Sequence, residues 1–330
     1  MEEPDTDQAH PGLPTQEPGA QDARVRDELL AAVSREEEGS VPDAAVWAAI
    51  ASVERIACHV GTTDAEELTV LLTDGAAAIG NAETLRLVGE AHDSVVRGLG
   101  YRARGMVVDA GVLNPEGGVY PVTTDARLLR AAVRAAHRTC AHVPYYGARY
   151  ADSAGRYSGT DSAWLAQLAD QPLTESQRQV DWLTRLLAAR GMPSWLMERH
   201  LGDLVDALEE AAGSQAAGSL PQVRDELARR RQAVVPDVIL DEAERVLAQE
   251  LGEEPAPVGG AGALLAAAVA DVGSGLLTHD RALFTWLTDP ARCGAPARRA
   301  LESTRASVYR VARVDVPTLQ QARGRRPASS

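Results

Sequence analysis

Aromatic side chains are concentrated in one stretch of this 330-residue chain. Seven of its thirteen Tyr, Trp and Phe residues lie between positions 145 and 195. Tyr and Trp rings offer large contact areas with few rotatable bonds and also carry a polar group, so binding pockets and interfaces use them often. The segment predicts a pocket for a small aromatic or hydrophobic molecule, or a surface for another protein. The candidate binding residues are Tyr145, Tyr146, Arg149, Tyr150, Tyr157, Trp164, Trp182 and Trp195.

The same rings have a second interpretation, in which they fill the core. Much of the apolar content of the chain is Ala, which favours helix but buries little area, so a core built from it is short of large side chains. The segment 147–164, GARYADSAGRYSGTDSAW, is rich in Gly, Ser and Arg. It is expected to place several rings on a turn between helices, where a ligand could enter.

Histidine supports an alternative function. Neutral His is the commonest metal ligand and also binds haem iron, so a haem- or metal-dependent enzyme or sensor would use His92 or His137. His137 and His142 flank Cys140, but a spacing of five puts them about 140° apart on a helix, too far round to bind one ion together. HExxH and Glu-x-x-His patterns are absent. No cofactor is predicted from these residues, and haem or iron stays the alternative.

Catalysis finds little support in the residue types. All 33 basic residues are Arg, and the missing lysine excludes P-loop, kinase and Schiff-base chemistry. A GxSxG motif is also absent. Cys140 follows His137 by three residues, but a Cys on a helix is far more often a small buried side chain than a nucleophile. We predict no catalytic residue and favour a binding, regulatory function over an enzyme.

Charge is unevenly distributed along this acidic chain. The net charge is −14; residues 1–40 hold 11 Asp and Glu against 3 Arg, whereas residues 292–330 hold 9 Arg against 2 acids. An Arg-rich tail over 317–330 could contact phosphates, which makes a nucleic-acid-associated protein the third hypothesis. The acidic body argues against it, because it repels a polyanion.

Cysteine usage and hydropathy favour a cytoplasmic protein. The three cysteines, Cys58, Cys140 and Cys293, lie far apart, which argues against a disulfide framework. Residues 1–22 have neither a basic start nor an apolar run, so no secretory signal is expected. The most apolar window, 258–277, consists largely of Gly and Ala, so no membrane span is expected either.

Apolar residues recur at steps of three and four, the spacing of one face of a helix. One such stripe comprises Leu85, Val88, His92, Val95 and Leu99, and another comprises Leu129, Val133, Ala136, Cys140, Val143 and Tyr150. Pro144 is expected to bend or end the second helix. Thr174 and Gln177 predict a capping box at the start of a helical hairpin over 174–210, with its turn at Gly191.

These patterns predict an all-α fold, either a helical bundle or orthogonal helical domains. At most one short strand is expected, near 307–316, where β-branched residues alternate but also fit a helical face. Clusters of Gly and Pro mark the breaks. They divide the chain into a disordered acidic arm (1–22), a main helical domain (23–212), a linker (213–221), a C-terminal helical region (222–316) and the Arg-rich tail (317–330).

Overall fold

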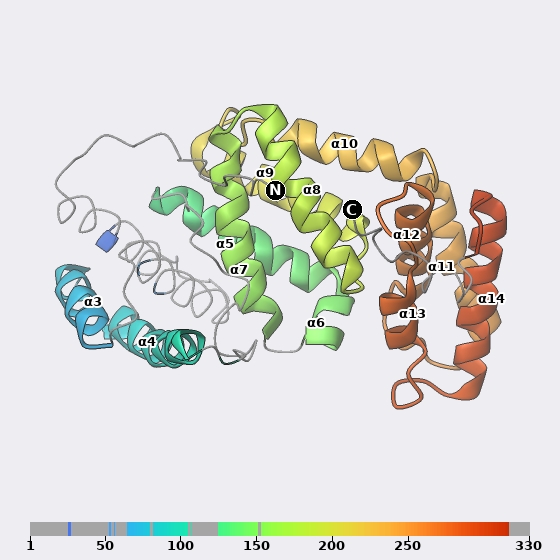
Figure 1. The fold of residues 1–330 in the computed structure, drawn as a ribbon, viewed down its shortest axis with the longest axis horizontal. Coiled ribbons are helices and arrows are strands. Elements are labelled where there is room, and N and C mark those ends of the chain that lie inside the picture. Colours follow the sequence, from blue (N-terminus) through green and yellow to red (C-terminus); the bar gives the residue numbers. More distant parts are fainter. Residues whose placement is uncertain are drawn as a thin grey trace, which may run out of the picture.

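The structure, a computed structural model, describes residues 65–79, 82–104, 125–150 and 153–316, together with positions 26, 27, 53, 56 and 106. Within these residues it contains twelve α-helices, one short 3-10 helix and no strand, so the chain has the predicted all-α fold (Figure 1). The acidic arm and the Arg-rich tail lie outside the described residues. The helices of the first half are α3 (Ala65–Ile79), α4 (Ala82–Ala103), α5 (Ala126–His142), α6 (Pro144–Tyr150) and α7 (Ser153–Gln167). Those of the second half are α8 (Leu173–Ala189), α9 (Ser194–Ala212), α10 (Leu220–Gln232), α11 (Asp237–Leu251), α12 (Ala261–Gly273), α13 (Arg281–Leu287) and α14 (Ala295–Ala312).

Helix α5 lies at the centre of the first packed group, against α7 and α9. Its predicted stripe is largely buried, since Leu129, Val133 and Ala136 are inaccessible to solvent. The Asp125 carboxylate caps the helix by accepting the Arg127 main-chain N–H at 2.8 Å. As expected at Pro144, α5 ends and the short helix α6 begins. The proline thus separates α5 from the short helix that carries Tyr145, Tyr146 and Tyr150.

Helices α8 and α9 form the predicted hairpin, but its start differs from the expectation. No side-chain cap bonds the first turn of α8: the N-cap position is Pro172, and Thr174 lies inside the helix. The capping-box prediction was therefore wrong, because the fixed φ of proline already starts the helix two residues earlier. The turn does contain Gly191, with φ of +92°, a conformation that favours glycine.

In a second group of helices, α11, α13 and α14 pack around α12 (Figure 1). Residues 261–271 of α12 are all buried, because this Ala- and Gly-rich helix lets its neighbours approach on several sides. No described helix is long and apolar enough to cross a membrane. Residues 307–312, where a strand was possible, form the last turns of α14; Val308 is buried and Val311 is exposed, as on one helix.

The two groups are joined by polar contacts as well as by apolar packing. Residues 214–219 turn the chain from α9 into α10, and α10 packs back on α8 and α9 and also touches α12. The buried guanidinium of Arg231 on α10 forms two hydrogen bonds with Glu198 of α9, at 2.8 and 2.9 Å, and one with Asp237 of α11, at 2.6 Å. These contacts fix the angle between α9 and the helices that follow it.

Candidate functional site

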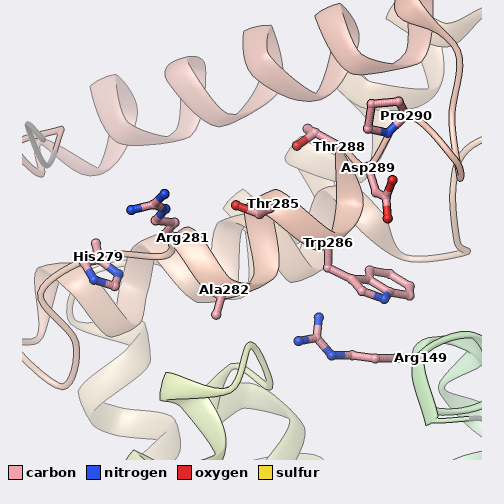
Figure 2. Close-up of a pocket in the computed structure, with 9 residues that line it drawn as sticks. All are labelled: Arg149, His279, Arg281, Ala282, Thr285, Trp286, Thr288, Asp289 and Pro290. Carbon is pink, nitrogen blue, oxygen red and sulfur yellow. The ribbon is translucent and has the colours of Figure 1, made fainter.

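A pocket of about 710 Å³ lies beside α13, next to the aromatic face of α6. It is a shallow surface pocket that is open to solvent over most of its extent. Figure 2 shows Arg149 reaching from α6 toward the indole of Trp286 on α13. The residues that line the pocket are Arg149, His279, Arg281, Ala282, Thr285, Trp286, Thr288, Asp289 and Pro290.

Arg149 is the side chain that connects the pocket to the aromatic residues. Its guanidinium carbon lies 5.6 Å from the ring centroid of Tyr145, 5.7 Å from that of Tyr150 and 5.4 Å from that of Trp286. A cation at such distances is attracted by the ring quadrupole. Nη2 donates to the Arg190 carbonyl at 2.6 Å, whereas Nη1 is buried and has no hydrogen-bond partner among the described residues. The guanidinium is therefore held in place with one donor group to spare.

Tyr145 anchors the back of this arrangement. Its ring is fully buried and meets Trp286 edge to face, with the centroids 5.0 Å apart. Its hydroxyl donates a short hydrogen bond to the Gly191 carbonyl. Burial raises the pKa of Tyr145 well above its usual value, and the positive charge of Arg149 opposes that rise. The phenol therefore stays protonated and acts as a structural donor.

Gly191 allows the hairpin turn to approach α13 closely. A Cβ at this position would lie only 3.0 Å from the Leu283 main-chain nitrogen and 3.1 Å from Arg149 Nη2. The positive φ and this crowding both require glycine. On its other side the same turn binds α6, because the carbonyls of Arg190 and Gly191 accept hydrogen bonds from the Arg149 and Tyr145 side chains.

Positive charge dominates the pocket wall. Arg149 and Arg281 line it, and neither forms an ion pair with a described residue. Asp289 is the one acidic residue in the lining, and it already faces Arg292, with 4.0 Å between Oδ2 and Nε. The Arg292 guanidinium carbon also lies 4.4 Å from the Trp286 ring centroid. Two guanidinium groups therefore contact this indole.

The aromatic candidates from the sequence fall into two places. Tyr146, Tyr150 and Trp195 pack against the same apolar cluster as Tyr145. Trp164 and Trp182 form a separate pair between α7 and α8, with their centroids 6.5 Å apart; Trp164 is buried and Trp182 is half exposed. Tyr157 lies in α7, and its side chain is outside the described part of the chain. The segment thus supplies both core and pocket residues.

Most of the pocket lining was missed by the sequence reasoning. His279, Arg281, Thr285 and Trp286 follow the aromatic segment by more than eighty residues and stand in no recognisable motif. The only available signal was Trp286 itself, one of five tryptophans in the chain. Its pairing with Tyr145 depends on the fold.

The metal and haem alternative gains no geometric support. His92 already uses both ring nitrogens, with Nε2 2.9 Å from Thr69 Oγ1 and Nδ1 3.1 Å from Asp93 Oδ1. His137 lies on another helix, α5. Among the described residues, no three His, Cys, Asp or Glu side chains come together as a metal site requires. Burial raises the pKa of Cys140 to about 11, the opposite of what a nucleophilic thiol needs.

A second polar cluster is enclosed between α5, α7 and α9. His200 lies 2.9 Å through Nε2 from Ser162 Oγ and 3.0 Å through Nδ1 from Thr139 Oγ1, and Thr139 donates to Asp203 at 2.6 Å. The row of groups is similar to a nucleophile and its base. Ser162 and Thr139 are buried in the core, however, so neither hydroxyl is exposed to a substrate. We interpret this cluster as a structural network.

Comparison of the chain with protein-family models, with curated proteins and with solved structures finds no match. The groups that line the pocket can bind a ligand through guanidinium, hydroxyl and aromatic contacts. Neither an activated nucleophile nor a pair of close carboxylates lines it.

Proposed function

We propose that this chain is a ligand-binding protein whose ligand, a small molecule, occupies the pocket between α6 and α13. One observation carries the proposal: the Arg149 guanidinium, which lines the pocket, is fixed among three aromatic rings, and its Nη1 has no hydrogen-bond partner among the described residues. A buried donor without a partner costs free energy, so this one needs an acceptor, which a ligand in the pocket can supply.

The surroundings of Arg149 support a preformed site. Its carbonyl partner belongs to the α8–α9 turn, which Gly191 brings close to α13. Tyr145 packs beneath the guanidinium and is itself bonded to that turn. A site whose polar groups are already oriented loses little entropy on binding.

We also propose a cytoplasmic location and a regulatory role. The free thiols of Cys140 and Cys293 support a reducing compartment. A binding site without activated catalytic groups suits a protein that senses a small molecule and changes its contacts with another protein.

Fluorine NMR of protein labelled with 5-fluorotryptophan tests the site directly. The chain has five tryptophans, and the resonances of Trp286 and Trp182 can be assigned with Trp286→Phe and Trp182→Phe. We expect a fragment library of small aromatic and hydrophobic molecules to yield compounds that shift the Trp286 resonance in a saturable way. Trp182 is the matched control, because it is half exposed but lies on α8, outside the pocket lining.

Two outcomes would contradict the proposal. If compounds bind but shift only the Trp182 resonance, the ligand site is at the Trp164–Trp182 pair instead. If no compound shifts Trp286, the pocket is not a small-molecule site. The aromatic residues of α6 would then be core residues only.

A further inference from the structure

We infer that the ligand of this pocket is a small organic anion, with a carboxylate or phosphate group on an apolar body. This inference rests on the proposed function and adds the chemical class of the ligand. It comes from the charges in the pocket wall, from the apolar groups beside them and from the way Arg149 is held.

The two arginines of the pocket lining differ in their ion pairing from two other arginines that are buried or half-buried. The buried Arg231 is paired with Glu198, and the half-buried Arg305 forms hydrogen bonds of 2.6 and 2.7 Å with both oxygens of Asp280. Arg149 and Arg281 form no ion pair with any described residue, although the chain as a whole carries a net charge of −14. Two unpaired guanidinium groups in one wall of an acidic protein favour an anionic ligand.

The geometry of a guanidinium favours an oxyanion in particular. Its planar N–H groups match the spacing of carboxylate and phosphate oxygens, and such hydrogen bonds are stronger than neutral ones. Nη2 of Arg149 donates to the Arg190 carbonyl, whereas Nη1 has no partner among the described residues and can donate to a ligand. Nη1 is buried, but it belongs to a side chain that lines the pocket, so a movement of the guanidinium toward the ligand would let it donate to an oxygen atom.

The rest of the lining indicates an apolar body on the ligand. Ala282, Trp286 and Pro290 contribute carbon surface between the charged groups. Trp286 is contacted by the guanidinium groups of both Arg149 and Arg292, so its surroundings are positive as well as apolar. A ring or short chain that bears one oxyanion satisfies both features, whereas a neutral apolar molecule leaves the cations unpaired.

Four probes with the same benzene ring test the inference: benzoate, phenyl phosphate, benzamide and benzyl alcohol. Titrations follow the fluorine resonance of Trp286 at low and high salt. We expect the two anions to bind at least about tenfold more tightly than the neutral pair, since charge-assisted hydrogen bonds are about twice as strong as neutral ones. Added salt should weaken the anions alone. The difference between benzoate and phenyl phosphate then assigns the oxyanion.

Two variants and one control connect the effect to the pocket cations. Arg281 is exposed and forms no ion pair with a described residue, so Arg281→Gln should leave the fold intact and weaken the binding of benzoate or phenyl phosphate severalfold. Arg149→Met should weaken it further. Arg134→Gln, an exposed residue of α5 outside the pocket lining, is the control for net charge and should leave the affinity unchanged.

The possible results distinguish failure of this inference from failure of the proposed ligand-binding function. Equal binding of benzoate and benzamide at Trp286, unaffected by Arg281→Gln, would overturn the anionic ligand and leave a pocket for neutral molecules. Equal losses in Arg281→Gln and Arg134→Gln would also overturn it, because net charge alone would then explain the preference. Failure of all four probes to shift Trp286 would overturn the inference together with the proposed pocket.

Discussion

The carboxylate of Asp271 accepts two hydrogen bonds from Ser194: one from the main-chain N–H to Oδ2 at 2.9 Å, and a short one from the hydroxyl to Oδ1. Ser194 is the first residue of α9, whereas Asp271 lies fully buried on α12. The side chain of Asp271, on α12 in the second group of helices, therefore accepts hydrogen bonds at the start of α9 in the first group. Burial raises the pKa of Asp271 from 3.8 to about 7, and the bonds from Ser194 only partly oppose that rise.

From the raised pKa of Asp271 we predict that the free energy of unfolding decreases as pH rises toward neutrality. In the unfolded chain the Asp271 carboxyl loses its proton near pH 3.8, but in the folded protein it keeps the proton up to about pH 7. Between these values the folded state binds more protons, so the free energy of unfolding decreases with rising pH. Asp271→Asn keeps an acceptor for Ser194 without a charge and should flatten this slope. It should also make the protein more stable than wild type at pH 8.

Urea unfolding at a series of pH values measures this effect. Asp206→Asn, an exposed position on α9, is the control and should keep the wild-type slope. If Asp271→Asn shows the wild-type slope as well, Asp271 is ionised in the folded protein throughout this range.

For His200 we predict the opposite effect, a loss of stability as pH falls in the acid range. Burial lowers its pKa from 6.5 to about 4. As pH falls from about 6.5 toward 4, His200 becomes protonated in the unfolded chain but stays neutral in the folded protein. The free energy of unfolding therefore decreases in this interval. His200→Gln should remove this loss, at some cost in stability at pH 7. The comparison is made in the Asp271→Asn background, because Asp271 titrates in the opposite sense.

The exposed His142 provides the control for the His200 prediction. His142→Gln should leave the acid limb of the stability profile as it is. An acid limb that persists in the His200→Gln variant would mean that His200 is charged in the folded protein or that another group determines the loss.

We predict that loss of the buried ion pairs of Arg231 destabilises the protein much more than loss of an exposed ion pair. Its guanidinium is almost fully buried and binds Glu198, Asp237 and the Val235 carbonyl. Arg231→Met leaves the Glu198 carboxylate and that carbonyl without their donor, which costs about 3–5 kcal/mol for a buried pair. Arg245→Met removes the exposed pair with Glu242 and should cost far less, because solvent screens an exposed ion pair. Chemical denaturation of both variants checks the contrast, and losses of similar size would mean that the Arg231 network contributes little net stability.

Local features of the fold could be predicted from the sequence. The stripe that begins at Leu129 and the proline at position 144 define α5 and its end because both act through neighbours one turn away. The turn at Gly191 was predictable for the same reason. The start of α8 was not, because Thr174 and Pro172 both carry N-terminal signals and only the packed structure shows which one the helix uses.

Contacts between distant segments account for what the sequence could not show. Residues 307–316 fit a strand or a helix equally well until Val308 and Tyr309 are seen to pack against α12. The Tyr145–Trp286 contact joins positions far apart in the chain, and no spacing rule predicts it. The seven aromatic residues therefore indicated a binding region without indicating its opposite wall.

The close approach of α11 and α12 gives a final prediction, at Gly262. A Cβ on Gly262 would lie 2.5 Å from the Ala243 carbonyl oxygen and 2.6 Å from the Glu244 Cα. These are main-chain atoms of α11, so the two helices would have to move apart. The movement would also pull the N-terminus of α12 from the Glu244 carboxylate, which accepts the Gly262 N–H at 2.7 Å and the Ala263 N–H at 3.1 Å. Gly262→Ala should therefore destabilise the protein by about 1–3 kcal/mol, the usual cost of overpacking.

Gly202→Ala is the matched control in a helix interior. Its added methyl group would meet only the Arg224 Cδ, at an ordinary contact distance of 4.0 Å. Removal of a helical glycine then stabilises by about 0.5–1 kcal/mol. Thermal unfolding of the two variants should move the melting temperature in opposite directions. An upward shift for Gly262→Ala would show that α11 and α12 lie farther apart than the close contact at Ala243 requires.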